Sequence, residues 1–181
     1  MMAVKFMVTH GKGICNRIYE DFMENDGLLD HVLKSLRTFF GSLNCPNFSK
    51  VQEYYERNPH RMVITQLMHH FVVEDATDLN TDIAVVLSLV PFKNKDEKFR
   101  IELSLVDKFV ALFVVENESS IVVTDRNRNN SECVTILKLL EKENYILIPK
   151  EILTSQIPFN RPNSNGNSTV YNALFSDVEL D

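Results

Sequence analysis

Residues 82–124 read DIAVVLSLVPFKNKDEKFRIELSLVDKFVALFVVENESSIVVT, and this stretch decides the fold. β-Branched and aromatic residues are dense in it, and polar turn residues at 93–96 and 107–108 divide it. We expect strands at residues 82–90, 99–106, 109–116 and 121–124. Together they predict a β-meander around which the rest of the chain packs.

The two faces of this meander differ in polarity. In the strand at 99–106, apolar residues alternate with Arg100, Glu102 and Ser104, which predicts one dry face and one face in water. The strands at 82–90 and 109–116 are apolar on both faces, as expected for strands that are covered on both sides. Either the strand at 99–106 lies at a sheet edge, or the second face is partly open and offers apolar surface to a partner.

The segments before the meander predict mainly helices. Apolar spacing indicates helices at residues 13–25 and 27–43, separated at Asp26–Gly27, and a short third helix from about residue 48 to 58. Residues 61–73 fit either a helix or a strand. Their β-branched residues favour a strand that pairs with residues 82–90, which brings the meander to about five antiparallel strands.

The segments after the meander predict short elements that close the fold. Asn130 or Ser131 caps a predicted helix at residues 131–143. A short buried strand at 145–148 and a helical turn that starts at Pro149 follow it. A polar loop at residues 160–168 then leads to a small docking element at 169–181.

These elements predict a single α+β domain over residues 1–181. It comprises N-terminal helices in residues 1–59, a central antiparallel β-meander in 60–125, and a helix, a short strand and a C-terminal docking segment in 126–181. The chain is 44% apolar and 24% charged, which is ordinary globular usage. At 181 residues it can bury a core without disulfide bonds.

Composition also excludes several classes of function. A net charge of −6 argues against nucleic acid as the partner, because phosphate binding needs clustered Lys and Arg. No apolar run is long enough to cross a membrane, and the first residues do not form a signal peptide, so we expect a cytoplasmic protein. Cys15, Cys45 and Cys133 are too far apart for a zinc knuckle or a disulfide framework. The sequence predicts no cofactor and does not set the oligomeric state.

No catalytic signature is present, so we do not expect an enzyme. His69 and His70, near Glu74 and Asp75, are potential metal ligands, but neighbouring residues of a strand point to opposite faces and cannot share an ion. Residues 11–13 read GKG before a predicted helix, without the complete phosphate-loop pattern.

Two further groups of residues could carry chemistry only if the fold brings them together. His10, Asp30, His31 and Cys15 could act as acid, base and nucleophile, but no family-specific motif surrounds the cysteines. Arg126 and Arg128 could contact phosphates, and Tyr54 and Tyr55 could stack on bases. In an acidic chain, a solvated turn is the simpler interpretation of the two arginines.

The acidic connection between the strands at 61–73 and 82–90 is the surface feature that best predicts binding. Glu74, Asp75, Asp78 and Asp82 crowd it, and it contains no basic residue. Grouped carboxylates speed association with a cationic protein. We therefore predict these four residues as a site for a basic partner.

The end of the chain carries two apolar segments, LLEKENYILIP at residues 139–149 and VYNALF at 170–175. With the small acidic α/β character of the chain, they resemble the closing segments of immunity proteins, which neutralise contact-dependent or other polymorphic toxins of bacteria. The resemblance implies a cognate toxin as partner, often a nuclease, whose basic active-site cleft the acidic connection would occlude.

Two alternatives stay open. One is an enzyme or a small-ligand-binding α+β domain, whose site is built from scattered residues such as His31, His69, His70 and the cysteines. The other is an interaction adaptor that acts on a phage or host protein. This adaptor differs from an immunity protein only in its partner.

Overall fold

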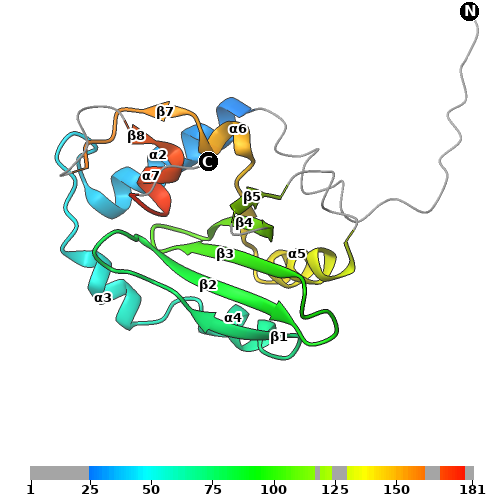
Figure 1. The fold of residues 1–181 in the computed structure, drawn as a ribbon. Helices are drawn as coiled ribbons and strands as arrows, with labels where there is room; N and C mark the ends of the chain where they lie inside the picture. Colours follow the sequence, from blue (N-terminus) through cyan, green and yellow to red (C-terminus); the bar gives the residue numbers. More distant parts are fainter. Residues whose placement is uncertain (1–24, 117–118, 124–129, 162–167, 178–181) are drawn as a thin grey trace, which may run out of the picture.

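The structure is a computed structural model that describes residues 25–116, 119–123, 130–161 and 168–177. It has an α+β fold with an antiparallel meander, which confirms the predicted fold class (Figure 1). The helices are α2 (Asn25–Phe40), α3 (Lys50–Glu56), α4 (Arg61–Leu67), α5 (Ser131–Lys142), α6 (Lys150–Leu153) and α7 (Val170–Leu174). The strands are β1 (Phe71–Asp75), β2 (Ala84–Pro91), β3 (Lys98–Ser104), β4 (Phe109–Glu116), β5 (Ser119–Val122), β6 (Ile146–Leu147), β7 (Gln156–Ile157) and β8 (Ser168–Thr169).

The main sheet has the order β1-β2-β3-β4-β5, with every neighbouring pair antiparallel. β6 adds to β4 in parallel, where Phe109 pairs with Ile146. β7 and β8 form a separate two-stranded sheet. β3 therefore lies between β2 and β4, and the prediction that it could be an edge strand is wrong. β1 is an edge strand of the sheet.

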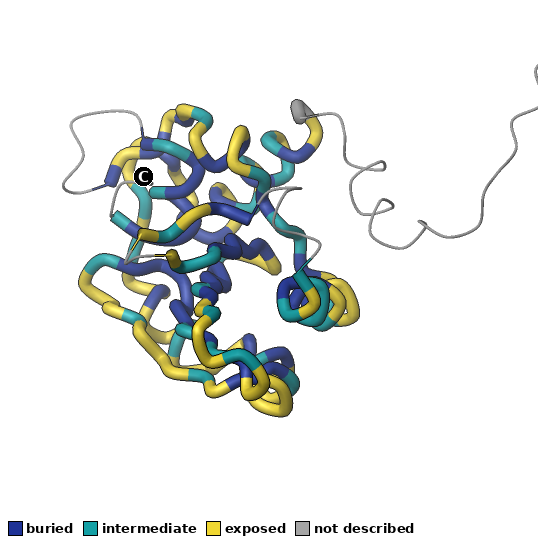
Figure 2. The backbone as a smooth tube through the Cα atoms, turned by 45° about the vertical axis from the view of Figure 1, so that its right-hand side comes forward, coloured by how far each residue is buried: buried dark blue, intermediate teal, exposed yellow. Residues whose placement is uncertain are grey.

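Helices lie on both sides of the main sheet. Figure 1 shows α4 and α5 on one side and α2, α6 and α7 on the other. α4 contacts both α5 and β1, and α7 contacts both α2 and α6. Figure 2 shows buried residues in the interior of the molecule and exposed residues along its outer turns. The core thus forms two apolar layers, one on each face of the sheet.

The strand predicted at residues 61–73 is only partly correct. Residues 61–67 form α4, and the strand that pairs with β2 begins at Phe71. Val63 and Leu67 are four residues apart, so in a helix both side chains reach the same buried layer. This packing outweighs the preference of the β-branched residues for a strand.

The predicted wet face of β3 is only partly correct, because the Arg100 side chain is 32% exposed but the rest of this face towards Ser104 is covered. Glu102 and Ser104 are fully buried, because α7 lies over this end of the sheet. The Ser104 hydroxyl donates to the carbonyl of Leu174 at 2.9 Å, and the Tyr171 hydroxyl donates to Glu102 Oε1 at 3.1 Å. The C-terminal docking element predicted from the tail is therefore present as α7, and it supplies polar partners to polar strand residues.

The remaining predicted elements have mixed outcomes. Asn130 caps α5 as predicted, and its side chain accepts hydrogen bonds from the backbone N–H groups of Glu132 and Cys133. The predicted break at residues 26–27 is absent, since α2 runs through them, and residues 13–24 lie outside the described residues. Pro149 precedes α6 as its N-cap residue. Within the described ranges, no helix has the length and apolar character to cross a bilayer.

Candidate functional site

The acidic connection runs from the end of β1 to the start of β2. Glu74 lies on β1 opposite Ser88, Asp75 ends that strand, and Asp78 lies in the turn that follows. These three residues are exposed, whereas Asp82 is only 7% exposed. The structure therefore brings three of the four predicted carboxylates to the surface at one end of an edge strand and buries the fourth.

Hydrogen bonds fix the Asp75 carboxylate. The Tyr55 hydroxyl on α3 donates to Asp75 Oδ2 at 2.9 Å, and Thr77 donates to Oδ1 from its backbone N–H at 3.0 Å and its hydroxyl at 2.6 Å. Partial burial acts to raise the pKa of Asp75, but the bonds from Thr77 and Tyr55 outweigh it, and the net shift is downward. The carboxylate is thus held ionised, and it ties the connection to α3.

The turn after β1 is closed by its own side chains. Asp78 Oδ1 accepts from the backbone N–H of Asn80 at 3.0 Å and from its side-chain amide at 2.8 Å. Asp82 Oδ2 accepts from the backbone N–H of Asp78 at 2.9 Å. These bonds fix the loop before any partner binds, so that less conformational entropy is lost on association.

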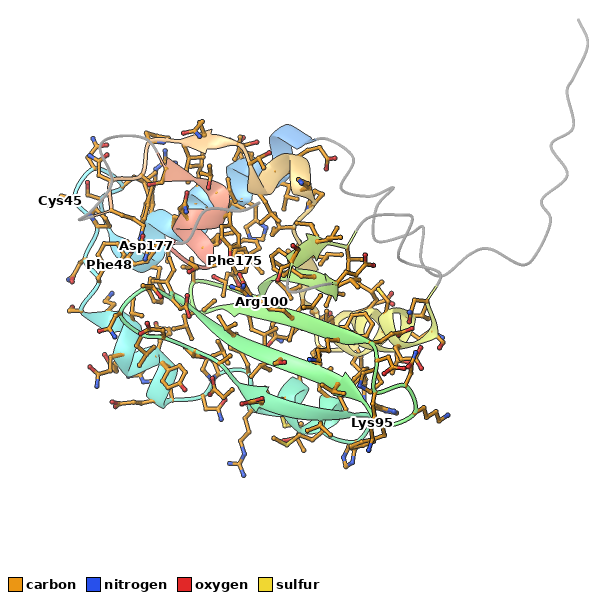
Figure 3. The ribbon with its side chains drawn as sticks, viewed as in Figure 1. Cys45, Phe48, Lys95, Arg100, Phe175 and Asp177 are labelled. Atoms are coloured by element: carbon orange, nitrogen blue, oxygen red, sulfur yellow. The ribbon has the colours of Figure 1, made fainter. Side chains whose placement is uncertain are left out.

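Arg161 clamps the end of this connection to the C-terminal segment. Its guanidinium donates to the carbonyl of Asn172 at 2.6 Å and to that of Thr81 at 3.0 Å, and its Nε lies 2.5 Å from Asp177 Oδ1. Burial lowers the pKa of Arg161, and the nearby carboxylates of Asp177 and Asp82 oppose this shift. The guanidinium also lies 5.8 Å from the centre of the Phe48 ring. Figure 3 shows Phe48 and Asp177 at the same end of the molecule.

A hollow of about 440 Å³ opens beside this clamp. Its walls are the chain at the start of α3, the end of the acidic connection and the clamp itself. Asp82 is the one predicted carboxylate that lines it. Arg161 is already bound to Asn172, Thr81 and Asp177. A ligand in this hollow would therefore meet mainly its shape and its backbone groups, rather than an unpaired charge of Arg161.

The acidic partner of His31 is Asp107, and not its sequence neighbour Asp30. Its Nε2 lies 3.5 Å from Asp107 Oδ2 in the turn between β3 and β4, and the Ser35 hydroxyl donates to the same oxygen at 2.9 Å. Asp30, next to His31 in the sequence, is exposed. This histidine lines a second hollow, of about 410 Å³, together with Lys34, Lys50 and Tyr54.

The other residues that the sequence singled out do not assemble a reactive site. His69 and His70 are exposed in the turn after α4 rather than in a strand, and no group of three potential metal ligands exists within the described part of the chain. Cys133 is buried and Cys45 is exposed. His10, residues 11–13, Cys15, Arg126 and Arg128 lie outside the described residues.

Sequence reasoning missed three charged residues that matter in the structure, namely Glu102, Asp107 and Arg161. Glu102 was the easiest to find, because strands that are apolar on both faces flank it and a covered strand needs partners for its polar groups. Asp107 is a turn residue and Arg161 lies in a polar loop. No local pattern marks either one as the partner of a distant residue.

Comparisons with known proteins give no relative for this fold and its surface. No family model matches the chain, and no curated protein or solved structure matches it either.

Proposed function

We propose that this chain is a protein-binding domain that inhibits a basic partner, as an immunity protein inhibits its cognate toxin. The observation that carries the proposal is the set of three exposed carboxylates, Glu74, Asp75 and Asp78, at one end of edge strand β1. Residues 74–82 contain no Lys or Arg to neutralise them. In this proposal the protein acts in the cytoplasm.

The fixed geometry of these carboxylates supports a role in recognition. Asp75 and Asp78 are held by hydrogen bonds from Tyr55, Thr77 and Asn80, so their charges have defined positions. Preorganised charges at the rim of an interface act mainly on the association rate and on the choice of partner. Against a nuclease toxin, the carboxylates would occupy the positions of substrate phosphates in its basic cleft. A basic phage or host protein would use the same surface.

The test begins with affinity capture from the source cell lysate and continues with the purified partner. Glu74→Gln, Asp75→Asn and Asp78→Asn, combined in one variant, remove three charges without large steric change. We expect the association rate to fall by about tenfold and its salt dependence to flatten, because steering by these charges is lost. Stopped-flow fluorescence at two ionic strengths measures both quantities.

The matched control removes three exposed carboxylates elsewhere, through Asp96→Asn, Glu141→Gln and Glu151→Gln. This control has the same net charge as the test variant, and it should retain most of the wild-type rate. Equal rates and equal salt slopes in the two triple variants would refute the placement of the interface. A captured partner that is acidic would refute the electrostatic mechanism.

A further inference from the structure

The hollow beside His31 collects positive groups in a chain whose net charge is −6. Its walls come from α2, from α3 and from the turn between β3 and β4. Lys34 and Lys50 line it from the two helices, and His31 and Asp107 face each other in its wall. It shares no lining residue with the hollow beside Arg161. It is therefore a separate feature from the acidic connection.

Among the described residues that line this hollow, the one carboxylate is already engaged. Asp107 Oδ2 accepts from Ser35 and lies 3.5 Å from His31, and its Oδ1 accepts from the backbone N–H of Lys108 at 2.8 Å. The His31 ring also meets the ring of Phe109 edge-on, with centroids 5.2 Å apart. Asp107 thus orients the imidazole and has little capacity left to bind a cation.

Among the described residues, the two lysines and Tyr54 have no partner for their side-chain donors. Neither Lys34 nor Lys50 forms an ion pair with any residue that the structure describes, and the Tyr54 hydroxyl forms no hydrogen bond within the same set. The Tyr54 ring packs edge-on against Phe39 at 4.8 Å, which fixes its position in the wall. An ammonium group binds a phosphate as a point charge, and a phenol adds a directed hydrogen bond.

We propose that this hollow binds a small phosphomonoester, whose phosphate is held by Lys34 and Lys50 and whose remaining atoms lie against Tyr54 and Phe39. A volume of about 410 Å³ falls within the range of small-molecule pockets. It exceeds what a phosphate ion alone would fill. In this arrangement, Asp107 fixes the orientation of the His31 ring. The proposal does not depend on the proposed inhibition of a basic protein.

The experiment is an amide NMR titration of the full chain with inorganic phosphate and then with phenyl phosphate, at pH 7 and constant ionic strength set with sodium chloride. We expect saturable shifts at residues 31–38, 50–54 and 106–107, and tighter binding of phenyl phosphate than of phosphate. Lys34→Gln with Lys50→Gln should weaken both affinities by at least tenfold, because the two point charges are lost.

The matched control replaces two exposed lysines outside the hollow, through Lys138→Gln and Lys150→Gln. It should bind both probes as the wild type does, and its spectrum reports whether the fold is retained. Shifts that rise linearly without saturation in the wild type would overturn the proposal. Equal affinities in the two double variants would also overturn it, because binding would then follow net charge rather than this hollow.

Discussion

From Ile101 to Ser104, the two faces of β3 are equally dry, although their side chains have opposite character. Ile101 and Leu103 on one face and Glu102 and Ser104 on the other are all fully buried. The apolar face is sealed by hydrophobic packing, which tolerates many partners of suitable volume. The polar face is sealed by α7, whose Tyr171 and Leu174 supply specific hydrogen bonds. Alternation of polar and apolar residues therefore separates the faces of a strand without showing which of them meets water.

Burial of Glu102 on the polar face costs electrostatic free energy. Glu102 forms an ion pair with Arg100 through Oε1, and the same oxygen accepts from Tyr171. Its buried Oε2 has no hydrogen-bond partner among the described residues. Burial raises the pKa of Glu102 to about 7, although Arg100 and Tyr171 act against this shift and Asp82 adds to it. The attachment of α7 to the sheet is therefore linked to pH, whereas the packing of Ile101 is not.

The largest expected effect is on the apolar face. Ile101→Ala should lower the free energy of unfolding by about 2–5 kcal/mol, because it removes buried methyl groups and leaves a cavity. The loss should be the same at pH 5 and pH 8, as measured by urea denaturation at each pH. Val72→Ala, at a strand position that is 56% exposed, is the control and should change stability little. If the stability lost by Ile101→Ala varied strongly with pH, the proposed difference between the two faces would be wrong.

The second prediction concerns the charge on the polar face. The pKa of Glu102 rises from 4.5 in the unfolded chain to about 7 in the fold, so the native state binds the proton more tightly. The stability that this group contributes is therefore complete below pH 4.5 and is lost as pH rises to 7. The loss amounts to about 3 kcal/mol at 1.36 kcal/mol per pKa unit. Glu102→Gln, which cannot ionise, should abolish it.

A second buried group opposes this effect and has to be separated from it. Burial lowers the pKa of His60 to about 4, so its contribution to stability is lost as pH falls from 6.5 to 4. The correct quantity is the difference in unfolding free energy between wild type and Glu102→Gln, because the His60 contribution is common to both. As pH rises from 4.5 to 7.5, the unfolding free energy of the wild type should fall relative to that of Glu102→Gln. A difference that is constant over this range would show that Glu102 does not titrate as proposed.

Much of the fold could be predicted from the sequence, because local pattern and packing agree. The strands at 82–90, 99–106 and 109–116 and the helix at 131–143 follow from hydrophobic period and capping, and the structure confirms them. Residues 61–67 form a helix instead of a strand, because tertiary packing decided between two patterns that the sequence allowed. The covering of β3 depended on residues about 70 positions away, as in the bond between Ser104 and Leu174.

The candidate site was predictable in part, for a similar reason. A run of carboxylates without basic neighbours marks a charged loop from sequence alone, and Glu74, Asp75 and Asp78 are exposed. That Asp82 turns inward depends on the closure of the loop onto itself and on Arg161. The pair formed by His31 and Asp107 joins residues from α2 and a distant turn. Such pairs follow from the topology, which no local spacing encodes.

The smallest expected effect concerns the Ser104 hydroxyl on the polar face, which donates to the Leu174 carbonyl and accepts from the backbone N–H of Val106 at 3.2 Å. Ser104→Ala should lower the free energy of unfolding by about 1–2 kcal/mol, because the Leu174 carbonyl loses its donor in a buried place. Ser88→Ala is the matched control, since Ser88 pairs with Arg100, lies on the same face of the sheet and is half-buried. Amide hydrogen exchange should quicken in α7 for the first variant and stay unchanged for the second. If both variants lost equal stability, the Ser104 hydrogen bond would add nothing beyond burial. The two faces of β3 would then differ in composition but would be stabilised in the same way.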